Sequence, residues 1–377
     1  MKNDYLDFYG KNKISPVNQD ITDIEVHYKR RQKLYRQCGL PTVAFKGAQM
    51  LEVGPGGGHN ALAPIHWGVE HIDLVEPNLT GVERIRELFS QRGISEYKYS
   101  IINEQIENYR SDKKYDIVVA EGFLGYVPNA RDICKKLITL TNDGGVIAIT
   151  CSDDICIFIE LMKRLIGLYL TKDIKALDDK VRFLIPIFEK QLAALRGVSR
   201  PAKDWIEDNI FNPAFSNGCE YSVGDALDTF DGCDLLGGSP NIFTNYSWYK
   251  DIWYDELSDY KEQFNTKRMS FIMAGLNENK LDASESARLV EFFSKIKSLE
   301  NTYEQEYDET ILREIVENLK EHRPEMNVLG NDFCLVYDEI INALDEVLSG
   351  ERVDMSKYPD FFKAFGRGLQ YLAFMKK

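Results

Sequence analysis

The stretch MLEVGPGGGHN, Met50–Asn60, decides the fold of this chain. An apolar run ends in the acid Glu52, and four glycines and a proline then fill residues 54–58. A strand that ends in a glycine-rich turn and opens into a helix is typical of nucleotide-type sites, because the backbone approaches the ligand closely and helix amides point at it. The stretch therefore predicts a ligand site directly after a first strand.

Around this stretch, short apolar segments alternate with helical patterns. Such alternation predicts a doubly wound parallel α/β sheet. The two helical patterns in this part of the chain cover residues 79–93 and 130–145. Pro64 falls within the helix expected after the glycines, so that helix should be short or kinked. The strand candidates are residues 49–53, 71–76, 97–102, 115–122 and 146–150.

The rest of the chain is mostly helical in pattern. An amphipathic helix precedes the sheet within residues 21–41, and after Thr150 the alternation stops. Apolar segments at 233–238 and 269–275 are the expected sixth and seventh strands. The resulting division is an N-terminal helical lid (1–45), a Rossmann-like core (46–151), a helical insertion acting as substrate cap (152–230), the end of the sheet (231–278) and a helical C-terminal extension (279–377).

Composition excludes several classes of function. The 377 residues are 44% hydrophobic, enough for a large core, and carry a formal net charge of −14, which argues against a nucleic-acid partner. The seven cysteines form no CxxC pair, so no zinc or disulfide framework is predicted. The most apolar helical stretch, residues 155–170, is interrupted by Glu160, Lys163 and Arg164 and predicts no membrane span. With no apolar signal at the start, we expect a reducing, cytoplasmic location.

The spacing of the glycines distinguishes two nucleotide-binding patterns. The dinucleotide fingerprint GxGxxG, read from Gly54, requires a third glycine where His59 stands. The pattern that fits is E-x-G-x-G-x-G, formed by Glu52, Gly54, Gly56 and Gly58. It resembles motif I of the class I S-adenosylmethionine (SAM) methyltransferases.

Polar residues after the later strands strengthen this resemblance. Glu76 ends the second strand, where the family places a carboxylate on the ribose hydroxyls, and Asn103-Glu104 end the third, where a side chain meets the adenine amine. Glu121-Gly122 end the fourth strand at the motif IV position. The resemblance implies a seven-stranded methyltransferase sheet with SAM as cofactor. The cofactor-binding residues that it implies are Tyr28, Glu52, Gly54, Pro55, Gly56, Gly58, Asn60, Glu76, Pro77, Asn78, Asn103, Glu104 and Gly122.

Methyl transfer requires that the acceptor be held in line behind the sulfonium methyl and that water be excluded; a hydroxyl or protonated amine also needs a base. The candidates for that base are Glu121 and, more weakly, His27. A metal-assisted variant would use Glu121 with Asp153 and Asp154, but these two aspartates also suit a helix N-cap, and we predict no metal.

The acceptor is expected to be a small molecule methylated on oxygen or nitrogen, with a sugar or surface-glycan precursor implied by a faint likeness to long bacterial methyltransferases. Arg200, Trp205 and Tyr249 are the substrate-binding candidates. Apolar stripes on the C-terminal helices should bury against the cap or a second subunit of a homodimer. The alternatives are a catalytically weak SAM-binding scaffold and an NAD(P)-dependent oxidoreductase.

Overall fold

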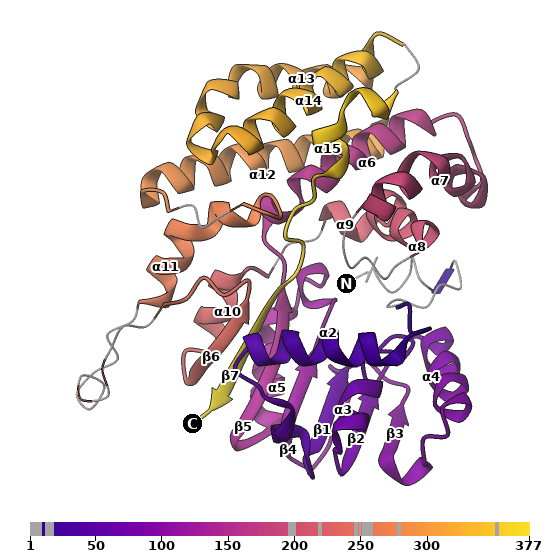
Figure 1. Ribbon diagram of the computed structural model, residues 1–377, viewed down its shortest axis with the longest axis vertical. Helices are drawn as coiled ribbons and strands as arrows, with labels where there is room; N and C mark the ends of the chain where they lie inside the picture. The colour runs from indigo at the N-terminus through magenta and orange to yellow at the C-terminus, as the bar shows by residue number, and fades with distance from the viewer. Residues whose placement is uncertain are drawn as a thin grey trace. The chain divides into compact units, whose positions relative to one another are not determined.

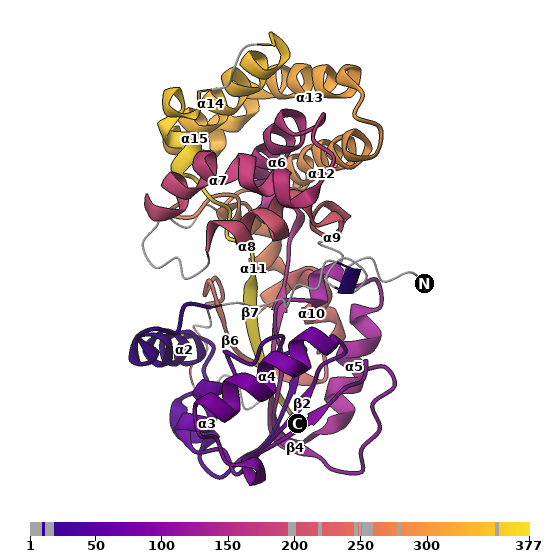
Figure 2. The same ribbon diagram turned by 90° about the vertical axis from the view of Figure 1, so that its right-hand side faces the viewer.

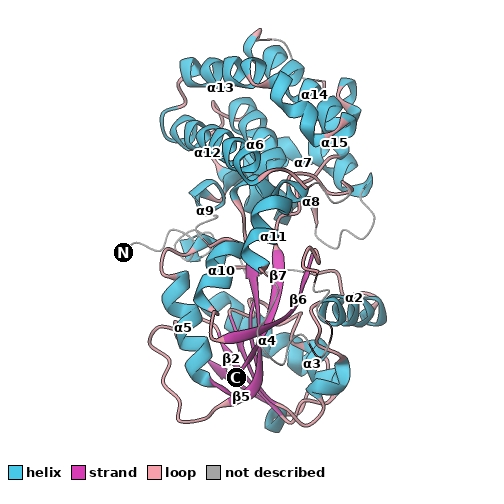
Figure 3. Ribbon diagram, turned by 90° about the vertical axis from the view of Figure 1, so that its left-hand side faces the viewer, coloured by secondary structure: helices cyan, strands magenta, loops and turns pink. Residues whose placement is uncertain are grey.

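The computed structural model describes residues 10–11, 19–194, 201–217, 221–244, 248, 250, 259–276, 280–350 and 354–377. The chain divides into two compact units. Unit 1 comprises residues 1–152, 218–264 and 369–377, and unit 2 comprises residues 153–217 and 265–368. The sheet lies in unit 1, and unit 2 is helical (Figure 3).

Unit 1 contains a seven-stranded sheet in the order β3-β2-β1-β4-β5-β7-β6. The first five strands are parallel to one another, and β7 runs antiparallel to both β5 and β6. Because β1 lies between β2 and β4, the carboxyl ends of these three strands meet at one edge. The strands are β1 (Gln49–Val53), β2 (His71–Val75), β3 (Tyr99–Ile102), β4 (Tyr115–Ala120), β5 (Thr141–Cys151), β6 (Cys233–Ser239) and β7 (Gln370–Lys376).

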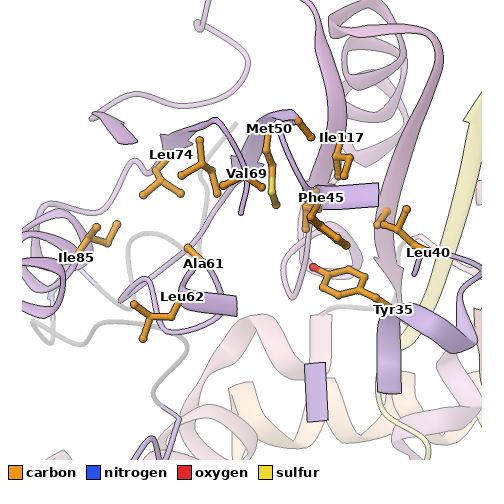
Figure 4. Packing of buried hydrophobic residues seen from close by; sticks show 14 of the residues in the cluster. Tyr35, Leu40, Phe45, Met50, Ala61, Leu62, Val69, Leu74, Ile85 and Ile117 are labelled. Atoms are coloured by element: carbon orange, nitrogen blue, oxygen red, sulfur yellow. The ribbon is translucent and has the colours of Figure 1, made fainter. Parts of the chain in front are cut away.

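Helices cover both faces of this sheet (Figures 1 and 2). The helices α2 (Ile24–Gln37), α3 (Leu62–Trp67) and α4 (Leu79–Gln91) lie on one face, and α5 (Ala130–Leu140) and α10 (Val223–Thr229) lie on the other. The core on the α2 side joins Tyr35 and Phe45 to Met50 and Ile117 of the strands (Figure 4). As predicted, the helix that contains Pro64 is short, at six residues.

Two sequence-based assignments at the end of the sheet are wrong. Residues 269–275 are not the seventh strand: Arg268–Phe271 form a 3₁₀ helix buried in unit 2. The true β7 is formed by Gln370–Lys376, within the C-terminal segment that was expected to be helical. The only helix at this end of the described chain, after residue 358, is α15 (Pro359–Lys363). A short apolar run can form either a helix or a strand. Residues 370–376 form a strand because β5 and β6 offer them hydrogen bonds on both sides.

The boundary between α5 and β5 also differs from the expectation. The helix predicted over 130–145 ends at Leu140, and β5 begins at Thr141, five residues earlier than predicted. Its register against β4 shifts between Tyr115 and Ile117, and Gly144 has a positive φ of 74°. Gly144 therefore lies at an irregularity within a longer strand.

Unit 2 is built around α6 (Phe158–Leu170), whose first eleven residues are all buried. The polar side chains of this helix have partners inside the unit: Glu160 accepts from the Gly366 amide, Lys163 donates to the Ala364 carbonyl, and Arg164 pairs with two glutamates. The other helices are α7 (Leu177–Ala194), α8 (Ala202–Ile206), a π-helical turn (Glu207–Phe211), α9 (Pro213–Asn217), α12 (Ala283–Glu306), α13 (Glu309–Glu321) and α14 (Asn331–Leu348), with α11 (Tyr260–Lys267) at the boundary between the units.

Within the part of the chain that is described, no helix has both the length and the apolar character needed to cross a bilayer.

Candidate SAM site

The glycine turn after β1 has the backbone that its sequence predicts. Gly54, Gly56 and Gly58 have φ values of 69°, 56° and 78°, a region that side chains with a Cβ rarely adopt. A Cβ on Gly58 would lie 3.0 Å from Ile85 of α4, and one on Gly54 would lie 3.1 Å from the ring of Phe123. The glycines are therefore needed for the turn itself and for its close packing.

Glu76, directly after β2, is held against this turn. Its two carboxylate oxygens accept hydrogen bonds from the amide of Gly56, at 2.7 Å, and from the amide of Asn78, at 2.8 Å. The side chain is 2% exposed, and burial raises its pKa to about 7, although both amide hydrogen bonds oppose the shift. Each oxygen keeps a second lone pair, which is what two ribose hydroxyls require.

The remaining predicted adenosine contacts lie beside Glu76. Asn78 caps α4 by accepting from Thr80, and the Asn103 amide donates to the Glu76 and Pro77 carbonyls. The Asn103 oxygen keeps its accepting lone pairs in these contacts, and Glu104 is half-buried. Pro55 and Asn60 accept backbone hydrogen bonds within the turn and at the start of α3.

Glu121, after β4, is enclosed by groups from α2. Arg31 Nη2 lies 2.6 Å and 2.7 Å from its two oxygens, and the Tyr35 hydroxyl donates to it at 2.8 Å. The Gly122 amide next to it donates to Thr150 at 2.7 Å and so joins the ends of β4 and β5. The sequence analysis does not predict this ion pair, because Arg31 lies on an amphipathic helix and has the pattern of a surface residue. The i, i+4, i+8 spacing of His27, Arg31 and Tyr35 on one helix face was the available signal.

His27 reaches the same turn from the first part of α2. Its Nε2 lies 3.0 Å from the His59 carbonyl oxygen, and since a carbonyl only accepts, Nε2 carries the proton and Nδ1 the lone pair. Burial and the nearby Arg31 lower the pKa of His27 to about 4. Tyr28 points elsewhere and stacks on the His66 ring at 4.1 Å.

Glu52, in β1, completes the group of acids. It is 4% exposed, and burial first, then the charge of Glu121, raise its pKa to about 8. Among the described residues, no group hydrogen-bonds to its Oε2. A buried carboxyl oxygen without a partner at a ligand-binding edge suits a cationic ligand group.

The predicted substrate residues are not gathered here. Arg200 and Tyr249 lie outside the described residues. Trp205 is 8% exposed and packs in the core of unit 2, with its ring 5.3 Å from that of Phe188. The aspartates considered for a metal are paired with cations. Both carboxylate oxygens of Asp153 accept from the single Nε–H of Arg268, and Asp154 pairs with Lys297 at 2.8 Å.

The strand order matches what the sequence resemblance implies, and residues 27–175 match the family model of the methyltransferase domain. This part of the chain is therefore similar to a methyltransferase domain. The cofactor that the sequence resemblance implies is SAM. The residues fit that cofactor, since the glycine turn admits a closely approaching ligand, Glu76 offers paired acceptors, and Glu52 offers a buried carboxyl oxygen to which no described group hydrogen-bonds.

Solved methyltransferase structures resemble parts of this chain. They include a putative SAM-dependent methyltransferase from Listeria monocytogenes (16% identity, 35% of this chain and 57% of that chain, TM-score 0.28). CcbJ from Streptomyces caelestis matches at 19% identity, over 29% of this chain and 45% of that chain, with a TM-score of 0.26. The N-methyltransferase NodS from Bradyrhizobium japonicum WM9, solved with S-adenosylhomocysteine, matches at 14% identity, over 41% and 75% of the two chains, with a TM-score of 0.32.

The matches span only about half of the first two of these proteins, at 57% and 45% of their chains. At these TM-scores the assignment rests on the family model and on the strand order. A search of the curated proteins finds no match.

Glu76→Ala tests the ribose assignment. We expect the affinity for S-adenosylhomocysteine to fall about 10- to 150-fold, which corresponds to the ~1.5–3 kcal/mol of hydrogen bonds to a charged group. Calorimetry measures it, with Glu83→Ala on the exposed face of α4 as the control. Unchanged affinity in the Glu76 variant would remove this residue from the site.

Proposed function

We propose that this methyltransferase transfers a methyl group to an oxygen or nitrogen atom of a small molecule, with the cofactor held by the turn 54–58, Glu76 and Glu52. The observation that carries the proposal is the position of Glu76, with both its oxygens on backbone amides directly beside the glycine turn. The net charge of −14 disfavours a nucleic-acid acceptor. A saccharide acceptor rests on sequence likeness alone, and it is one arm of the test below.

In this proposal the adenine lies over the first turn of α4. Leu79 is 65% exposed there, next to the capping residue Asn78, and offers an apolar face at the edge of the site. Asn103 offers its free acceptor oxygen to the adenine amine.

Glu121 and His27 receive different roles. The oxygens of Glu121 are already engaged by Arg31 and Tyr35, so we propose that Glu121 positions α2 rather than taking a proton. A hydroxyl acceptor needs a base, whereas an amine that arrives deprotonated does not. For a hydroxyl acceptor, the lone pair on Nδ1 of neutral His27 is the proposed base.

The experiment is a transfer assay with methyl-labelled SAM and pools of amines, small hydroxyl compounds and saccharides, in which label in the product identifies the acceptor class. Thermal-shift measurements with SAM, S-adenosylhomocysteine, NAD and NADP accompany it. Stabilisation by the nicotinamide dinucleotides alone would overturn the proposed site. Label in none of the pools, with SAM bound, would favour the scaffold alternative.

His27→Gln separates a base from a structural residue once a hydroxyl acceptor is found. We expect turnover at saturating SAM to fall by about 10²-fold or more while the affinity for S-adenosylhomocysteine stays unchanged, since general-base catalysis contributes ~10²–10⁴-fold. The proposed role predicts that the pH dependence of the rate also changes. Unchanged turnover would exclude His27 as the base.

A further inference from the structure

The helix α2 has two faces of different character. Its inner face carries His27, Arg31 and Tyr35, which are buried and reach toward the glycine turn and Glu121. Lys29, two residues after His27, is exposed. Because two residues turn a helix by about 200°, the inner and outer sets of side chains lie on opposite sides of α2.

The outer face of α2 is basic and has no matching acid. Within the part of the chain that the structure describes, none of its cations forms an ion pair. The acid of this helix, Glu25, lies in its first turn. The basic face consists of four exposed residues, Lys29, Arg30, Lys33 and Arg36.

The basic face contrasts with the charge of the whole chain. Five basic residues and one acid give α2 a formal charge of +4, so the rest of the chain, which totals −14 together with the helix, carries −18. One of the five, Arg31, pairs with Glu121 in the interior. The other four cations repel one another at the surface, and an anionic partner would offset that repulsion.

Exposed apolar side chains lie near both ends of the basic face. Val26 of α2, four residues before Arg30, is 38% exposed. Val43 is 72% exposed in the 3₁₀ turn Thr42–Phe45, which packs against α2 through the rings of Phe45 and Tyr35. In Figure 1, α2 crosses in front of the sheet, so its outer face points away from the core of unit 1.

We propose that the basic face of α2 docks this protein on an anionic phospholipid surface, with Val26 and Val43 entering the headgroup layer. Lipid phosphates supply the anions that the four cations lack, and the interfacial layer accepts apolar side chains. A nucleic acid fits less well, because its binders need a wider basic footprint than two turns of one helix. The inference does not depend on the proposed SAM site.

The experiment is cosedimentation of the full chain with two kinds of vesicle, one of phosphatidylcholine alone and one of equal parts phosphatidylcholine and phosphatidylglycerol. The two salt conditions are about 0.1 M and about 1 M NaCl, since the screening length falls from about 10 Å to about 3 Å between them. We expect binding to the anionic vesicles at the lower salt only. No binding there, or equal binding to both kinds of vesicle, would overturn the inference.

The variant Lys29→Gln/Lys33→Gln/Arg36→Gln locates the docking face. Each cation at an anionic surface contributes about fivefold to partitioning, so the loss of three should lower the partition coefficient about 100-fold. Because these side chains point away from the core, the circular dichroism spectrum should stay that of the wild type. Unchanged partitioning of the folded variant would contradict docking through α2.

The matched control is Lys175→Gln/Lys190→Gln/Lys363→Gln, which removes the same formal charge from exposed positions of unit 2. It should partition as the wild type does. An equal loss in this control would mean that total charge rather than the basic face governs binding, and would overturn the inference. Binding of a short DNA duplex through the basic face, without binding to vesicles, would assign the face to a nucleic acid instead.

Discussion

Arg31→Met is expected to lower the free energy of unfolding of unit 1 by about 3–5 kcal/mol, because removing one partner of a buried ion pair leaves the other charge uncompensated. The charge left behind is Glu121, whose side chain is 7% exposed. Tyr35 also loses the hydrogen bond that it accepts from Arg31 Nη2. Chemical denaturation followed by circular dichroism measures the change, with Arg30→Met on the exposed side of α2 as the control.

The double variant Arg31→Met/Glu121→Gln separates the ion pair from simple packing. Once both charges are gone, most of the lost stability should return, and the double-mutant cycle should give a coupling energy well above that of distant sites. If the double variant is as unstable as the sum of the two single variants, the two residues do not act as a pair.

Arg164→Met should have an effect of similar size, about 3–5 kcal/mol, on unit 2. Arg164 is fully buried in α6, lies 3.0 Å from Glu300, and also contacts Glu304 and the carbonyls of Asn209, Ile210 and Asn212. The substitution leaves Glu300 without its cation in a dry interior, where burial already raises the pKa of this acid to about 8. We expect the helical circular dichroism signal of this variant to be lost at a lower denaturant concentration than that of the wild type.

The control for Arg164 is Arg182→Met on α7. Arg182 forms an exposed pair with Asp179 three residues away, and exposed pairs contribute little. We expect no measurable change in that variant. Adding Glu300→Gln to Arg164→Met should restore part of the stability. Equal destabilisation by Arg164→Met and Arg182→Met would contradict a stabilising role for the buried ion pairs of Arg164.

Most of the candidate SAM site could be proposed from the sequence, because its signals are local. The glycine turn, Glu76 and Glu121 each follow a short apolar strand, and the ends of adjacent parallel strands meet at one edge. The partners of these acids could not be predicted. Arg31 and Glu121 are 90 residues apart, and nothing in the sequence around either one points to the other.

The sequence by itself determined the first five strands, the sixth strand and the position of the ligand turn, since apolar runs, turns and glycines act over a few residues. Only the tertiary structure decided which run becomes β7. Residues 269–275 and 370–376 are both short and apolar, and the second becomes a strand because β5 and β6 offer it hydrogen bonds on both sides. The first has no such neighbours and is buried among helices of unit 2 instead. Tertiary structure likewise raises the pKa of Glu52, because the burial and the charges around it come from elements far away in the chain.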